Sequence, residues 1–141
     1  MSQPECVLGT GVDLVENDRV QQVIGRWGAK FKDRVFLAAE QAYCEAKASP
    51  WMYYAGRLAV KEALSKAFGT GISEDLSWLD MEVVKDPSSG APSIRLSPRG
   101  AVFARSRGVQ RILVSLSHTG NFAIAQALLI GSAPVKSDVG G

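Results

Sequence analysis

The chain has 141 residues, a size typical of one domain, so we expect a single domain over residues 1–130 with one hydrophobic core. An apolar fraction of 46% and a charged fraction of 21% are ordinary for a soluble globular protein and exclude disorder of the whole chain. The net charge of +2 argues against a chain built mainly to bind nucleic acid, because such proteins concentrate basic charge in a patch.

Strands and helices are both predicted. In chain order they are a strand at 6–15, helices at 16–27, 31–36, 40–46 and 51–68, strands at 76–84 and 93–96, a helix at 98–107, and strands at 111–117 and 122–129. The last two strands are joined by a tight turn that Gly and Asn favour. This order predicts an α+β fold, in which a small, mostly antiparallel sheet packs against one long central helix and shorter helices.

The first strand has an unusual face. Gly9, Gly11 and Asp13 share one side of it, while valine, leucine and other residues occupy the opposite side. Because two of these three positions lack a side chain, a ligand or another group can approach Asp13 closely.

The long helix carries charge on its apolar stripe. Its boundaries are marked by Ser49 as N-cap, Pro50 at the first helical position and Gly69 just past the end. The stripe, within about 60° of one direction, contains Trp51, Ala55, Leu58 and Ala59. Glu62 and Lys66 fall in the middle of this stripe. Charge in such a position is costly unless it is paired, bound to a metal or lining a cleft.

Two interpretations of Glu62 and Lys66 stay open at this point. They form an i, i+4 ion pair, or they belong to a site. Asp13 favours the site, because two converging carboxylates are the minimum that a protein contributes to Mg²⁺, which completes its shell with water and phosphate oxygens. Lys66 would then neutralise charge on a phosphate. Arg57 and Lys61 lie toward the side of the helix expected to be solvated.

Three stretches together resemble the holo-acyl-carrier-protein synthase branch of the phosphopantetheinyl transferases. They are Gly9-Thr-Gly-Val-Asp-Leu-Val-Glu16, the segment 55–71 with Lys-Glu-Ala-x-x-Lys at residues 61–66, and Val114-Ser-Leu-Ser-His-Thr119. The resemblance covers residues 7–129. The second stretch is a specific motif, whereas the first alone is weak.

The resemblance implies a reaction and a role for each residue. Such enzymes move 4′-phosphopantetheine from coenzyme A to a serine of an apo acyl carrier protein, in support of fatty acid biosynthesis. Asp13 and Glu62 would hold Mg²⁺ against the coenzyme A pyrophosphate. Glu62 would help to deprotonate the serine, and Lys66 would stabilise or protonate the leaving phosphate. Asp13, Glu62 and Lys66 are therefore the expected catalytic residues.

The resemblance also implies binding residues and an assembly. Coenzyme A contacts are expected from Arg57, Lys61, Lys66, Gly69, Pro92, His118 and Thr119. Arg19, which follows the Asp13 strand, would dock the acidic carrier protein. The family's assembly is a homotrimer with coenzyme A bound between subunits.

The sequence departs from the family pattern in three places. Ala91 stands where relatives often place Lys, which removes one expected phosphate contact. Leu37 stands where relatives often have a Thr or Ser cap, so the start of the following helix is open. The tail after residue 130 has no counterpart.

Other classes of function are weighed against this one. A non-catalytic coenzyme A or carrier-protein binding module could keep the same fold, although intact Asp13, Glu62 and Lys66 argue against it. A Mg²⁺-dependent nucleotide hydrolase would need a water-positioning residue that we do not identify. Gly9-Thr-Gly11 lacks the third Gly of a dinucleotide-binding loop, and no Gly-x-x-x-x-Gly-Lys-Ser/Thr loop exists.

The sequence also predicts a compartment. No apolar run reaches the roughly 18 residues of a membrane span, and the first residues lack a basic region, so we expect a cytoplasmic protein without membrane contact. Cys6 and Cys44 lie within apolar patterns and are expected to be buried thiols. Residues 131–141 mix Gly, Ser, Pro and single charges, and we expect a flexible tail there.

Overall fold

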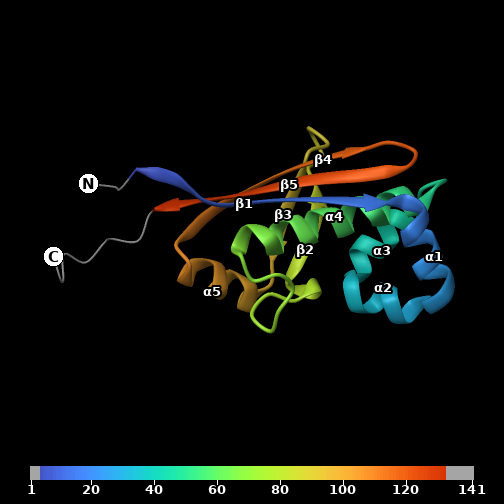
Figure 1. The fold of residues 1–141 in the computed structure, drawn as a ribbon, viewed down its shortest axis with the longest axis horizontal. Coiled ribbons are helices and arrows are strands. Elements are labelled where there is room, and N and C mark those ends of the chain that lie inside the picture. The colour runs from blue at the N-terminus through green and yellow to red at the C-terminus, as the bar shows by residue number, and fades with distance from the viewer. Residues whose placement is uncertain (1–3, 133–141) are drawn as a thin grey trace.

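The computed structural model describes residues 4–132. One long helix lies between a three-stranded sheet and a second, two-stranded sheet. Strands β1 (Glu5–Glu16), β4 (Val109–His118) and β5 (Phe122–Ser132) form an antiparallel sheet of order β1-β5-β4. Helix α4 (Pro50–Phe68) lies along one face of this sheet (Figure 1). The predicted α+β class with a long central helix is confirmed.

The remaining elements surround α4. Helices α1 (Asn17–Trp27), α2 (Ala29–Val35) and α3 (Ala38–Glu45) gather near one end of the molecule, and α5 (Pro98–Ser106) lies near the other (Figure 1). A second antiparallel pair, β2 (Met81–Lys85) and β3 (Pro92–Leu96), follows a short 3-10 helix, η1 (Trp78–Asp80). No helix within residues 4–132 is long and apolar enough to cross a membrane.

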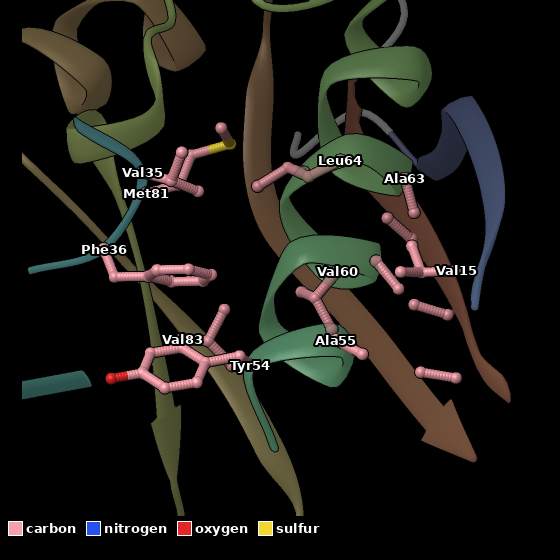
Figure 2. Close-up of a cluster of buried hydrophobic side chains, with 14 of the residues drawn as sticks. Val15, Val35, Phe36, Tyr54, Ala55, Val60, Ala63, Leu64, Met81 and Val83 are labelled. Atoms are coloured by element: carbon pink, nitrogen blue, oxygen red, sulfur yellow. The ribbon is translucent and has the colours of Figure 1, made fainter. Parts of the chain in front are cut away.

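The core is built on both sides of α4. Leu64 and Val60 point toward Met81, Val83 and Phe36, while other helix side chains lie on the sheet side (Figure 2). As a result, 12 of the 19 helix residues are buried. An isolated amphipathic helix would have one apolar stripe, but α4 has no fully solvated side.

Glycines set the distance between α4 and the sheet. A Cβ atom on Gly9 would overlap the carbonyl oxygen of Ala67, and one on Gly11 would overlap that of Ala63. The helix backbone therefore packs directly on β1, and the predicted close approach at the Gly-x-Gly-x-Asp face is made by α4. This contact carries Asp13 to the level of Glu62 and Lys66 on the helix.

Two predicted boundaries were wrong. The strand predicted at 76–84 begins only at Met81, because the Asp80 carboxylate accepts hydrogen bonds from the backbone N–H and hydroxyl of Ser77 and closes the η1 turn. Strand β5 continues through Gly131 and Ser132, and Gly131 pairs with Cys6 of β1, so the predicted tail starts too early. Residues 133–141 lie outside the described part of the chain.

The helix start left open at Leu37 is resolved. Helix α3 begins at Ala38 without a hydroxyl cap, and Glu40 supplies the cap instead by accepting the backbone N–H of Leu37 at 2.9 Å.

Candidate active site

Asp13, Glu62 and Lys66 meet where β1 crosses α4. The ammonium of Lys66 donates to Asp13 Oδ1 at 2.9 Å, and it also lies 3.4 Å from the carbonyl oxygen of Val12. The Asp13 side chain is only 11% exposed, whereas that of Lys66 is 55% exposed. Lys66 thus pairs with Asp13 across two elements, and the i, i+4 ion pair with Glu62 is not the arrangement found.

Glu62 lies against Asp13 in a partly buried position. Burial, followed by the hydrogen bond and the charge of Asp13, raises the pKa of Glu62 to about 7, although Lys66 and Arg19 oppose the shift. The hydrogen bond with Asp13 in turn raises the pKa of Lys66. Near neutral pH, Glu62 is therefore balanced between its two protonation states, which is the property a general base needs.

The two carboxylates fit a divalent cation. Asp13 Oδ2 is buried and has no hydrogen-bond partner, and a cation would satisfy it. It would also relieve the repulsion between two neighbouring carboxylates. Within residues 4–132 no group of three or more His, Cys, Asp and Glu side chains could hold a metal, so the chain offers two oxygen-bearing side chains here. This donor set suits Mg²⁺, which keeps several water ligands.

A second cluster, the cation cavity, contains Tyr43, Tyr53, Arg57, Lys85, Pro92 and His118 among its lining residues and has a volume of about 170 Å³. The Arg57 guanidinium stacks 4.1 Å from the centre of the Tyr43 ring, and its Nε is buried without a partner. Lys47 and Lys85 approach the same ring at 4.6 and 5.9 Å. Among the described residues that line this cavity there is no carboxylate, so an anion can bind without repulsion.

His118 is held at the edge of the cation cavity by α4. Its ring lies 5.8 Å from that of Tyr53, and a Cβ on Gly56 would come within 2.9 Å of its Cε1. Burial lowers the pKa of His118, and the nearby charge of Arg57 lowers it further, against a hydrogen bond with the Met52 backbone. The imidazole is therefore mainly neutral at pH 7.

The expectation that Lys61 is solvated was wrong. Its side chain is 0% exposed, and its ammonium donates to Glu40 Oε1 and to the carbonyl oxygens of Val35 and Trp78. Burial lowers the pKa of Lys61, and Glu40 opposes this shift. All three donors are used inside the protein, so Lys61 is not available to a coenzyme A phosphate. Arg57 was also placed on a solvated side and is 6% exposed, but it still faces the cation cavity.

The other predicted binding residues are dispersed. Pro92 lines the cation cavity. Thr119 lies in the β4–β5 turn, where its hydroxyl accepts the backbone N–H of Asn121 and of Phe122. Gly69 ends α4 in the left-handed conformation, with φ 78°, and does not line the cation cavity.

Arg19 lies near Glu62, across an apolar cavity of about 350 Å³. The residues lining this cavity, called the docking cavity below, are Leu14, Val15, Glu16, Arg19, Val20, Val23, Phe31, Leu58, Glu62 and Trp78. One opening therefore joins an exposed arginine of α1, an apolar floor and the partly buried carboxylate.

Sequence reasoning did not identify Tyr43, Lys47, Gly56 or Lys85 as part of the site. The sequence does indicate a close contact at Gly56, because a glycine inside a long helix lowers stability unless another group packs closely against it. Tyr43 and Lys47 are four residues apart on and just after α3, but only the tertiary structure brings them to Arg57.

Comparisons with known proteins point to one family. Residues 9–129 match the model of the 4′-phosphopantetheinyl transferase superfamily. The chain is 44% identical over 126 residues to a holo-[acyl-carrier-protein] synthase of Ruminiclostridium cellulolyticum, covering 89% of this chain and 92% of that protein. The crystal structure of the holo-[acyl-carrier-protein] synthase of Neisseria meningitidis superposes with a TM-score of 0.83 at 27% identity, covering 88% of this chain and 98% of that one. The Helicobacter pylori synthase in complex with coenzyme A gives a TM-score of 0.76 at 34% identity, covering 85% and 98%.

Proposed function

This chain belongs to the 4′-phosphopantetheinyl transferase superfamily, and from that membership we propose that it transfers 4′-phosphopantetheine from coenzyme A to a serine hydroxyl of an acyl carrier protein. The products are the holo-carrier protein and adenosine 3′,5′-bisphosphate. The observation that carries the proposal is the convergence of Asp13, Glu62 and Lys66 beside the docking cavity.

Asp13 and Glu62 would hold Mg²⁺. The bound ion supplies a positive charge that neutralises the pyrophosphate of coenzyme A and polarises the phosphorus under attack. The support for this assignment is the unpartnered Asp13 Oδ2 and the raised pKa of Glu62.

Glu62 acts on the attacking serine hydroxyl, and Lys66 acts on the leaving phosphate. Glu62 takes the proton of the serine hydroxyl, directly or through water, as the serine oxygen attacks the phosphorus that carries pantetheine. The bond between this phosphorus and the oxygen bridging it to adenosine 3′,5′-bisphosphate breaks. Lys66, whose side chain is 55% exposed, stabilises or protonates the departing phosphate.

The cation cavity fits the nucleotide end of coenzyme A. Arg57, Lys85 and His118 offer positive or hydrogen-bonding groups, and Arg57 Nε is a buried donor without a protein partner. Phosphate groups are the matching ligand because they carry negative charge and several acceptor oxygens. Binding of a phosphate to His118 would favour its protonated form.

The docking cavity fits the carrier protein. The serine must reach Glu62, so residues that flank the serine would cover the apolar floor of Val20, Val23 and Leu58. Arg19 at the rim would meet the acidic helix that follows the serine.

The trimer is proposed from the outer face of the sheet. Leu14 of β1 pairs with Ile124 of β5, and these side chains are 59% and 45% exposed. Val12 and Leu113 extend the exposed apolar surface at 56% and 45%. A patch of this kind on a sheet face is typical of an interface between subunits. We also propose that the protein acts in the cytoplasm, because both cysteines are free thiols.

The test is intact-protein mass spectrometry of an apo acyl carrier protein incubated with coenzyme A, Mg²⁺ and this chain. We expect the carrier to gain one phosphopantetheine group, and to gain none when its serine is replaced by alanine. Coenzyme A binding without transfer to any of several carriers would instead favour a binding module. Phosphate release without a carrier would favour a hydrolase.

A further inference from the structure

Asn17 links the start of α1 to the β4–β5 turn. Its side chain amide donates to the carbonyl oxygens of Thr119 and Gly120, both at 3.0 Å, although these residues are more than 100 positions away in the sequence. Its backbone N–H donates to the carbonyl oxygen of Asn121 at 2.9 Å. Asn17 is 5% exposed, so this link is inside the protein.

The amide is only half satisfied. Both neighbours of Nδ2 are carbonyl oxygens, which accept but do not donate, so the nitrogen of the amide must face them. That orientation leaves Oδ1 buried without a partner. A buried unpaired acceptor destabilises the folded state.

The fold does not require this side chain. Thr119 and Gly120 are exposed, so water can hydrogen-bond their carbonyl oxygens if Asn17 is replaced. The backbone bond from Asn17 to Asn121 would remain, and it is enough to join α1 to the turn. A costly amide at a position where an apolar side chain would suffice suggests a role other than stability.

The turn that Asn17 holds begins directly after His118, which lines the cation cavity. His118 is the last residue of β4, lines that cavity with Arg57 and directly precedes Thr119, whose carbonyl oxygen accepts from Asn17. His118 forms the last pair of the β4 ladder, opposite Ala123, so a shift of the turn that follows would act first on this pair and on the imidazole packed against α4.

We propose that Asn17 is a positioning residue that holds the β4–β5 turn so that His118 faces the phosphates of coenzyme A. The inference rests on the proposed function, because it takes coenzyme A as the ligand of the cation cavity. Asn17 also begins the helix that carries Arg19, so it fixes the nucleotide side of the site relative to the carrier-protein side.

The main test is Asn17→Leu, which keeps a similar volume and removes both the two donors and the unpaired oxygen. The affinity for coenzyme A, measured by calorimetry, should fall about tenfold, and KM for coenzyme A should rise about tenfold. The kcat at saturating coenzyme A should stay within about twofold, and the midpoint of urea unfolding should be unchanged or higher. Gln22→Leu, which also replaces a side-chain amide of α1 by leucine but at an exposed position, is the control and should leave coenzyme A affinity unchanged.

A second variant removes the two donors without changing the size of the side chain. Asn17→Asp keeps the shape of the side chain but presents no donor to the two carbonyl oxygens, so it should weaken coenzyme A binding at least as much.

The outcomes separate the inference from the function on which it rests. Wild-type affinity in both variants would overturn the positioning role. Loss of affinity that appears only together with loss of folded protein would overturn it as well, in favour of a purely structural amide. Failure of the unaltered chain to bind coenzyme A would instead remove the proposed function.

Discussion

Replacing Glu62 with Gln should make the protein less active and, at high pH, more stable. Burial and Asp13 raise the pKa of Glu62 from 4.5 to about 7 in the folded protein. Between these two values the folded chain keeps a proton that the unfolded chain releases. The contribution of Glu62 to stability is therefore fully present below about pH 4.5 and is lost as the pH rises through about 7.

The magnitude follows from the size of the shift. Each pH unit of difference in pKa corresponds to about 1.4 kcal/mol, which sets a ceiling of about 3 kcal/mol. Glu62 is only partly buried, so solvent screening reduces the expected effect to about 1–2 kcal/mol. Gln carries no titrating proton and does not lose this stability as the pH rises.

The assay is urea unfolding of both proteins at pH 4.5, 6 and 8, without divalent cations. The difference in unfolding free energy between Glu62→Gln and the unaltered protein should move by about 1–2 kcal/mol in favour of the variant from the lowest to the highest pH. Glu74→Gln, at an exposed carboxylate of the loop after α4, should show a flat difference. A flat difference for Glu62→Gln would refute the assigned environment of Glu62. Turnover by this variant should fall at least about 100-fold, as expected for loss of a general base.

Three further predictions concern other parts of the site. Gly11→Ala should cost about 3 kcal/mol or more of stability, because its methyl group would overlap the α4 backbone, whereas Gly25→Ala, with nothing within 4 Å, should be neutral or slightly stabilising; urea unfolding checks both. The unaltered protein should take up a proton on binding coenzyme A at pH 7, because burial lowers the pKa of His118 and a bound phosphate opposes that shift; calorimetry in buffers of different ionisation enthalpy should detect the uptake, and His118→Gln should reduce it. Chelation of divalent cations should stop transfer to the carrier protein and added Mg²⁺ should restore it, so full activity in excess chelator would contradict a metal held by Asp13 and Glu62.

The catalytic part of the site could be predicted from local patterns. The Gly-x-Gly-x-Asp face of β1 and the charged residues on α4 both break a simple apolar pattern, and the structure brings Asp13, Glu62 and Lys66 together as those breaks suggested. Helix caps are local as well, and Pro50 and Gly69 placed both ends of α4 correctly.

The positions of Arg57 and Lys61 could not be predicted in the same way. Helical periodicity sorts residues into one apolar and one solvated side, but α4 is covered by the sheet on one side and by β2 and the segment around Phe36 on the other (Figure 2). A lysine can be buried there only because Glu40 of α3, 21 positions earlier, supplies a carboxylate at 2.7 Å. Pairing over that distance depends on how the helices pack, which no window of sequence contains.

The burial of Lys61 affects how substitutions in this chain should be interpreted. Lys61, Glu62 and Lys66 stand within one turn and a half of helix, yet Lys61 ties α4 to α3, to the end of α2 and to η1, while the other two lie against Asp13 at the candidate active site. Removing one partner of such an enclosed pair leaves the other charge uncompensated and costs about 3–5 kcal/mol. A survey of variants scored by product formation alone would therefore group all three residues together. Measuring the amount of folded protein beside product formation would separate Lys61, whose substitutions lower the yield of enzyme, from Glu62 and Lys66, whose substitutions lower the turnover of each molecule.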